Sequence, residues 1–253
     1  MIANLINDFS TISLETLGTS SLLSRYTTKY ILKSSDLNNI LGKAYAMYNV
    51  LEVNGESCLP YSSIYYDTED NNMYLDHHNG KLDRYKIRFR TYLSNGKSFL
   101  EIKRKYNNGK CEKRRIAVST TDQFGEAEQN FINQNSPYCT SKLDSKLQVE
   151  YQRMTLVSQN KEERCTIDWN LAFSNDAFTY TVKDFAVVEI KKKTAKQTSY
   201  FEQILQHEGF TPMGMSKYCI GRILTDGDLK YNLFKGKILQ INKSTGLKLN
   251  LAA

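Results

Sequence analysis

The sequence is poor in proline and tryptophan and has no long apolar run. Its 253 residues include 3 prolines and 1 tryptophan, against 17 tyrosines. Proline cannot donate a backbone hydrogen bond, whereas tyrosine is enriched in strands, so this balance favours long, well-paired strands. No segment approaches the roughly 20 apolar residues that a membrane-spanning helix requires. We therefore expect a strand-rich protein with no direct insertion into a membrane.

The cysteines are not arranged as metal-binding or disulfide-forming pairs. The sequence has 5 cysteines, an odd number, and none of them forms a CxxC pair. This pattern disfavours a zinc site or a disulfide framework and favours a reducing compartment. The first eleven residues also lack the basic stretch and apolar core of a secretory signal. We therefore predict a cytoplasmic protein.

Positive charge is in excess. Lys and Arg number 34 against 27 Asp and Glu, which gives a formal net charge of +7. Such an excess favours anionic partners, namely nucleic acids, phosphate compounds or acidic membrane surfaces. The total does not choose among these partners, so the placement of the charges along the chain has to do so.

The chain shows no internal repeat and no interdomain linker, which predicts one domain over residues 1–253 with a core at about 25–224. Residues 2–17 have roughly helical apolar spacing, which predicts an amphipathic helix packed on that core. A C-terminal helical tail is also predicted to pack on it. Strands are predicted at 25–32, 61–68, 85–92, 99–105, 112–118, 147–157, 164–169, 178–182 and 185–191. Helices are predicted at about 34–48, 120–133, 197–207 and 216–224, with a turn-rich, exposed connection around His77 and His78.

The clearest pattern is a strict alternation of basic and apolar residues in the middle of the chain. An Asn95-Gly96 turn joins the first two of three such segments and predicts a hairpin. One face of these strands collects Lys86, Arg88 and Arg90, then Glu101, Lys103 and Lys105, then Lys113 and Arg115. Arg153, Arg164 and the pair Glu189 and Lys191 stand in later strands with apolar neighbours at the opposite parity. When only one strand shows this pattern, it usually means no more than that one face of the sheet is exposed to solvent.

The repetition of the pattern points to a bound anion. Neighbouring strands that place like charges on one face repel each other, and a polyanion would neutralise them. A flat sheet with this face would suit nucleic acid, whereas a closed barrel with the face inward would suit a phosphate chain. Tyr85 and Phe89 lie on the face opposite to Arg88 and Arg90, which disfavours base stacking and favours bare phosphate.

Short motifs across the chain resemble a known family. They are TTKY at 27–30, IRFR at 87–90, EIK at 101–103, the basic cluster at 113–115, YQR at 151–153, R-x-x-I-D at 164–168, VVEIK at 187–191 and SKY at 216–218. In this order they resemble the polymerase domain of the vacuolar transporter chaperone (VTC) proteins, within the triphosphate tunnel metalloenzymes. The resemblance implies an α+β, β-dominated fold, with a closed antiparallel eight-stranded barrel surrounded by helices.

The resemblance also implies site residues. The catalytic residues would be Arg88, Arg90, Arg153 and Arg164. The phosphate-binding residues would be Lys29, Lys103, Lys113, Arg115, Lys191 and Lys217. The divalent metal, Mg²⁺ or Mn²⁺, would be held by Glu189. Glu101 and Glu150 are further acids, for which an internal ion pair with a neighbouring Lys or Arg is the preferred interpretation over metal binding. The related CYTH proteins carry ExExK on the first strand. Here Thr27 stands where an acid would be, which favours the VTC branch.

The predicted function is polyphosphate synthesis, in which the γ-phosphate of ATP is transferred to a growing chain inside a basic tunnel. ATP and inorganic polyphosphate or triphosphate are the expected partners, without nucleic acid, and a membrane-protein partner would be needed to couple the reaction to a membrane. Three alternatives stay open at this point. They are a hydrolase of triphosphate or polyphosphate, a non-catalytic polyphosphate-binding module and an RNA- or DNA-binding barrel.

Overall fold

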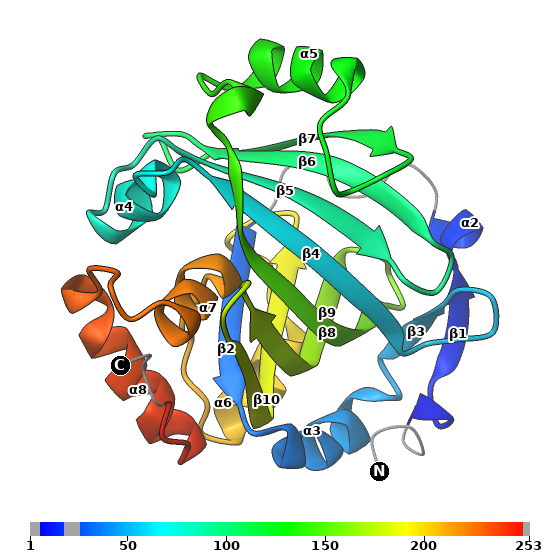
Figure 1. The fold of residues 1–253 in the computed structure, drawn as a ribbon. Coiled ribbons are helices and arrows are strands. Elements are labelled where there is room, and N and C mark those ends of the chain that lie inside the picture. Colours follow the sequence, from blue (N-terminus) through cyan, green and yellow to red (C-terminus); the bar gives the residue numbers. More distant parts are fainter. Residues whose placement is uncertain (1–5, 18–25, 250–253) are drawn as a thin grey trace.

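The computed structural model describes residues 6–17 and 26–249, and its main feature is one curled sheet (Figure 1). The strands are β1 (Ser10–Ser13), β2 (Tyr26–Leu32), β3 (Tyr48–Glu52), β4 (Leu59–Asp67), β5 (Arg84–Tyr92), β6 (Lys97–Lys105), β7 (Cys111–Val118), β8 (Asp144–Ser158), β9 (Glu163–Ser174) and β10 (Thr179–Lys192). The helices are α2 (Leu14–Leu17), α3 (Leu37–Ala44), α4 (Asn72–His78), α5 (Glu126–Asn135), α6 (Tyr200–His207), α7 (Lys217–Thr225) and α8 (Lys235–Thr245). Short 3-10 turns lie at Ser34–Asp36, Thr140–Lys142 and Asn232–Phe234.

Eight strands follow one another in the order β2-β10-β9-β8-β4-β5-β6-β7. Every pairing along this path is antiparallel, while β3 joins β8 at the side and β1 adds to β3 in parallel. The predicted β-dominated α+β class is therefore right. The sheet has ten strands rather than eight, and among the described residues β2 and β7 are not paired with each other, so a barrel closed by hydrogen bonds is not confirmed.

The concave side of the sheet has an apolar half, which α7 fills (Figure 1). Tyr218, Ile220 and Leu224 of this helix lie in one buried cluster with Leu147, Phe173 and other residues of β8, β9 and β10. The close approach depends on Gly221. A Cβ at that position would lie 2.5 Å from a ring carbon of Phe173 and 2.6 Å from a methyl group of Leu147.

Other helices cover the convex side. A second buried cluster joins α3 and α6 to β2, β8, β9 and β10, and it contains Trp169, which is 7% exposed as expected for a core residue. A third cluster joins α5 to Ile87 and Phe89 of β5 and to Leu100 and Ile102 of β6. None of the helices in the described part of the chain is long and apolar enough to cross a bilayer.

Several predicted elements are wrong in kind or in length. Residues 10–13 form a strand, and only Leu14–Leu17 are helical, so the predicted helix over 2–17 is not observed in its described part, while residues 2–5 lie outside it. The helix predicted to end near Tyr48 stops at Ala44, where β3 soon follows. The C-terminal tail is helical as predicted, in α8.

The predicted exposed connection around His77 is instead part of helix α4. His78 is 3% exposed, and the Nδ1 atom of His77 lies 3.0 Å from the sulfur of Cys219 on α7. The two short strands predicted at 178–182 and 185–191 are one strand, β10, interrupted by an irregularity between Val182 and Ala186. The polar residues at this irregularity, including Asp184 with a positive φ of 49°, account for the misplaced break.

Candidate functional site

Basic side chains gather on the concave side of the sheet, and we call this surface the basic inner face. It consists of Lys29 (β2), Lys86, Arg88 and Arg90 (β5), Lys103 (β6), Lys113 and Arg115 (β7), Arg153 (β8), Arg164 (β9), Lys191 (β10) and Lys217 (α7). Residues two apart in a strand point to the same side, so alternation places the strand members together. Their odd-parity neighbours Ile87 and Phe89 lie in the core beneath α5.

Glu101 on β6 holds the first group of cations. Its side chain is 1% exposed, and it accepts hydrogen bonds from Arg88 Nε at 2.9 Å and Arg88 Nη2 at 2.5 Å. Lys113 Nζ lies 3.3 Å from its other oxygen, and Arg90 Nη1 lies at 3.9 Å. Burial alone would raise the pKa of Glu101, but Arg88, Arg90 and Lys113 outweigh burial and hold this pKa well below its usual range. The predicted ion pairing of Glu101 is thereby confirmed.

Asp168 on β9 holds the second group. Arg153 Nε and Nη2 bind its two oxygens at 2.6 and 2.7 Å, and Lys217 Nζ lies 2.5 Å from Oδ2. Burial opposes the charge of Asp168, yet Arg153 and Lys217 outweigh it and lower the pKa below its usual range. Because Lys217 comes from α7, this carboxylate joins the helix to the sheet.

Glu189 on β10 holds the third group. It forms ion pairs with Lys29, its direct neighbour on β2, and with Lys191 at 2.8 Å. The pKa of Lys29 lies well below its usual range, first because of burial and then because of Lys217, Lys103 and Lys191. Glu189 was predicted to hold a metal, and in this structure its partners are two lysines.

Four cations of the basic inner face, Lys86, Lys103, Arg115 and Arg164, have no carboxylate partner among the residues that the structure describes, and two of them show the cost of this. The side chain of Lys103 is accessible to solvent, but the surrounding protein still desolvates it, and this desolvation, followed by the charge of Lys86, lowers the pKa of Lys103 to about 8. Burial also lowers the pKa of Arg164, whose Nε atom is buried without a hydrogen-bond partner. A buried donor without a partner costs free energy. The surface therefore carries positive charge that a bound anion would satisfy.

Tyrosines also line the basic inner face, although the aromatic neighbours of Arg88 and Arg90 on β5 lie on the opposite side as predicted. Tyr61 and Tyr65 of β4 point toward the cations, as the contacts of Arg90 Cζ 5.7 Å from the Tyr61 ring and Arg88 Cζ 5.5 Å from the Tyr65 ring show. Burial raises the pKa of Tyr65, but Arg88, Arg90 and Lys86 outweigh it and bring the pKa to about 8. The argument from the sequence against base stacking considered β5 alone. The alternation of residues 61–67 would have shown these tyrosines.

The structure thus brings the predicted site residues to one surface. Ten of the predicted residues lie together on it: Arg88, Arg90, Arg153, Arg164, Lys29, Lys103, Lys113, Lys191, Lys217 and Glu189. Arg115 lies at the exposed margin of this surface, on β7. Their individual roles stay predictions. Asp168 and Tyr65 were missed as site residues. Glu150 forms no ion pair with any described residue; it is exposed on β8 and accepts a hydrogen bond from Gln148.

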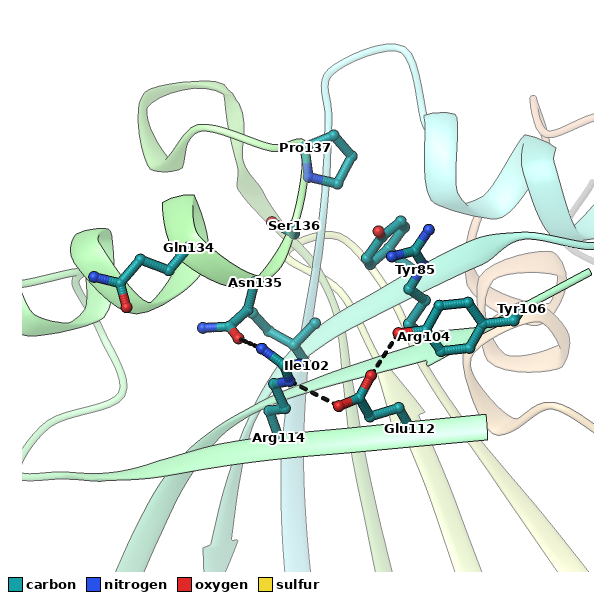
Figure 2. A pocket seen from close by; sticks show the side chains of 10 residues that line it. All are labelled: Tyr85, Ile102, Arg104, Tyr106, Glu112, Arg114, Gln134, Asn135, Ser136 and Pro137. Carbon is teal, nitrogen blue, oxygen red and sulfur yellow. Dashed lines mark hydrogen bonds and ion pairs between the residues drawn. The ribbon is translucent and has the colours of Figure 1, made fainter. Parts of the chain in front are cut away.

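A separate hollow lies on the convex side, between the end of α5 and strands β5 to β7 (Figure 2). It has a volume of about 310 Å³. Its polar groups bind one another: Glu112 accepts hydrogen bonds from Tyr106 and Arg114, and Arg114 also binds Asn135 at the end of α5. Arg104 beside them is paired with Asp83. We interpret these contacts as a clamp that fastens α5 to the sheet.

The fold matches that of solved structures of low sequence identity. A candidate adenylyl cyclase from Hippeastrum, described as having a dominant triphosphatase activity, superposes with a TM-score of 0.52 at 14% identity, over 83% of this chain and 99% of that chain. A candidate adenylate cyclase from Bacillus halodurans gives a TM-score of 0.51 at 11% identity, over 76% of this chain and 93% of that chain. This chain therefore shares its fold with these two proteins.

The family model of the VTC domain matches residues 24–225. The chain therefore belongs to the VTC domain family, as the order of its motifs predicted. The match spans every strand from β2 to β10 and ends with α7, so it includes all members of the basic inner face. No match is found among curated proteins.

Proposed function

We propose that this protein is a polyphosphate polymerase, which transfers the γ-phosphate of ATP to the end of a growing polyphosphate chain on the basic inner face. The observation that carries the proposal is the surplus of positive charge on the basic inner face. Glu101, Asp168 and Glu189 are each already shared between cations, while Lys103 and Arg164 have no carboxylate partner in the described part of the chain. A chain of phosphates offers one negative charge after another along such a surface.

The reaction would require little covalent chemistry from the protein. The terminal oxygen of the chain attacks the γ-phosphorus in line, and ADP leaves with the electrons of the broken bond. Arg88, Arg90, Arg153 and Arg164 would stabilise the negative charge of the transferring group. Glu101 and Asp168 would act as positioning residues, since they fix Arg88 and Arg153 through paired hydrogen bonds.

The basic inner face fits a divalent cation that arrives with its phosphates. No group of three or more metal-ligating side chains lies among the described residues, and Glu189 is the carboxylate predicted for this role. Its side chain is 22% exposed, so it can be approached. Mg²⁺ or Mn²⁺ commonly binds one or two carboxylates and takes its other ligands from substrate phosphates and water. Glu189 would hold the ion, which when bound neutralises charge on the phosphate oxygens.

Hydrolysis of triphosphate is the second candidate function. It is supported by the triphosphatase activity described for the Hippeastrum protein, which shares the fold. The same residues would bind the substrate, with water in place of the chain end as the acceptor. The two functions therefore differ in the acceptor and not in the cations.

The test is incubation of the purified protein with ATP, Mn²⁺ and a short polyphosphate primer, followed by gel separation of the products. We expect a ladder of lengthening chains, lost in Lys29→Ala and Glu189→Ala. Lys43→Ala is the matched control, because Lys43 lies on α3 at the convex side and pairs with Glu208. Free phosphate without a ladder would establish the hydrolase instead. Tight polyphosphate binding without turnover would leave a binding module.

A nucleic-acid barrel predicts a different result in the same preparation. Its binding of RNA or DNA would fall steeply with salt and would resist competition by low concentrations of tripolyphosphate. The proposed polymerase predicts that tripolyphosphate displaces nucleic acid. Delivery of the product across a membrane would need a membrane-protein partner, and this partner and the cytoplasmic location stay predictions.

A further inference from the structure

A row of aromatic rings crosses one end of the basic inner face, near the hairpin between β5 and β6. Tyr151 and Tyr61 are stacked, with centroids 5.4 Å apart and planes at 4°. Tyr61 contacts Tyr92 at 5.0 Å, and Tyr92 meets Phe99 edge-on at 5.7 Å. The row therefore runs across four neighbouring strands, from β8 through β4 and β5 to β6.

The two ends of this row differ in exposure. Tyr151 is 4% exposed and Tyr61 is 7% exposed, so they belong to the core. Tyr92 and Phe99 are half-buried. The row ends on Arg115, an exposed residue whose guanidinium carbon lies 4.5 Å from the centre of the Phe99 ring. Nη1 of Arg115 also lies 3.5 Å from the hydroxyl of Tyr92.

Arg115 differs from an arginine that serves structure alone. Arg104, on the convex side, has Tyr85 at 5.1 Å and Tyr106 at 4.3 Å, and it is bound to both oxygens of Asp83. Arg115 has one aromatic contact and no carboxylate partner in the described part of the chain. Its planar cation lies over Phe99 and is exposed to solvent.

The position of Arg115 relates it to the phosphate-binding residues. It stands directly opposite Glu101 in the pairing of β6 and β7, and Glu101 stands opposite Arg88. Neighbouring strands are about 4.8 Å apart, so the backbones of Arg115 and Arg88 are separated by about 10 Å. Phe99 stands opposite Arg90 in the same way. The exposed end of the row thus borders the proposed site of the triphosphate.

We propose that Arg115, Phe99 and Tyr92 form a stacking platform for the base of a nucleoside triphosphate. The base lies against the guanidinium plane of Arg115, which Phe99 supports from behind and Tyr92 fixes at its edge. Bases stack on aromatic rings and on arginine planes with little regard to sequence. This inference rests on the proposed function and deepens it, since it makes the phosphoryl donor a nucleotide rather than inorganic triphosphate. It also moves Arg115 from the phosphate ligands to the base.

The test compares two ligands that differ by the nucleoside. Isothermal titration calorimetry measures the binding of the β,γ-imido analogue of ATP and of inorganic tripolyphosphate, in the same Mg²⁺-containing buffer. The variants are Arg115→Lys, which keeps the charge and removes the plane, and Phe99→Leu and Tyr92→Leu, which keep apolar volume and remove the ring. Tyr85→Leu is the control, because Tyr85 lies on the opposite face of β5. Thermal unfolding checks that each variant is folded.

We expect each platform variant to weaken binding of the ATP analogue by roughly tenfold, which is the typical size of one base stack. Binding of tripolyphosphate should stay within about twofold, since the charges near the phosphates are retained. Tyr85→Leu should change neither affinity. Equal losses for both ligands, or no loss for the nucleotide, would overturn the platform. A wild-type protein that binds neither ligand would instead contradict the proposed function.

Discussion

Lys103 on β6 lies close enough to Lys29 on β2 to lower the pKa of Lys29, although five strands separate β2 from β6 in the hydrogen-bonded order. The two lysines meet because the sheet curls around α7, so residues from its two ends share one space. Desolvation and neighbouring cations both disfavour the charged form of each lysine, and only Lys29 has a carboxylate partner, Glu189, among the described residues. The crowding of positive charge that would favour a bound polyanion therefore also destabilises the free protein.

The pH dependence of anion binding follows from Lys103 and Tyr65, each with a pKa of about 8. As the pH rises through 8, Lys103 loses its positive charge and Tyr65 gains a negative one, so both changes weaken anion binding. We expect the dissociation constant of tripolyphosphate to rise between pH 7 and 9. Titration calorimetry at several pH values measures it. Lys103→Met and Tyr65→Phe should each flatten the profile, and an unchanged slope in both would contradict this assignment.

Lys103 also affects stability, in the opposite sense. Its pKa is lower in the folded protein than the usual 10.5, so between about pH 8 and 10.5 the unfolded chain binds more protons than the folded one. Stability from this group therefore increases as the pH rises through that window. We expect Lys103→Met to unfold at higher denaturant concentration than the wild type at pH 7, and this gain to shrink by pH 10. Urea unfolding at both pH values tests it.

Glu189 is occupied by Lys29 and Lys191, so a free metal ion has to compete with two lysines. Bound phosphates would attract both lysines and leave the carboxylate to the ion. We expect Mn²⁺ to bind weakly to the protein alone and roughly tenfold or more tightly with tripolyphosphate present, because phosphates supply most of its ligands. Electron paramagnetic resonance of Mn²⁺ measures both affinities. In the presence of tripolyphosphate, Mn²⁺ should bind to the Glu189→Gln variant no more tightly than it binds to tripolyphosphate in buffer without protein. Equal Mn²⁺ binding to the wild type with and without tripolyphosphate would count against this coupling.

The side chain of Glu101 is 1% exposed and neutralises Arg88, Arg90 and Lys113, so its loss leaves the largely buried Arg88 and Arg90 without a carboxylate partner. Removing one partner of a buried ion pair costs about 3–5 kcal/mol. We expect Glu101→Gln to lower the free energy of unfolding by about that amount and to regain part of it when tripolyphosphate is added. Glu112→Gln, on the convex side, should have a much smaller effect because Glu112 is partly exposed. Denaturant unfolding with and without tripolyphosphate separates the two cases.

Gly221 permits the contact between α7 and the sheet. Gly221→Ala should destabilise the protein by about 1–3 kcal/mol, because its methyl group would overlap with Phe173 and Leu147. Gly236→Ala in α8 is the control, since a Cβ there meets nothing within 4 Å. That change should be neutral or stabilising by up to about 1 kcal/mol. Urea unfolding compares the two, and equal behaviour would show that α7 can shift to make room.

The sequence predicted the chemistry of the basic inner face better than its architecture. Alternation with a period of two depends only on neighbours in the chain, so the side of Arg88 and Arg90 followed without knowledge of the fold. The pairing of Arg153 with Asp168 could not follow in this way. It depends on the register of β8 and β9, which is shifted between Glu150 and Gln152.

The errors in secondary structure also have a physical reason. Phe9, Ile12 and Leu17 are buried, as the helix prediction required, but Ile12 is buried through the pairing of β1 with β3, opposite Leu51. Spacing alone indicated which residues are buried and not which element buries them. The predicted closed barrel rested on resemblance, and nothing in the sequence of β2 or β7 indicates whether their edges pair.

Helix α7 fills the apolar half of the curled sheet and supplies Lys217 to Asp168, and it follows all ten strands in the chain. During synthesis, every strand therefore leaves the ribosome before the residues that cover its apolar inner side. The nascent sheet therefore carries an uncovered apolar surface until about residue 225 has emerged, and we expect chaperones to bind it in that interval. Helix α7 supplies both the covering of this apolar surface and Lys217, so we expect a ribosome-bound chain that stops short of α7 neither to resist protease nor to retain polyphosphate.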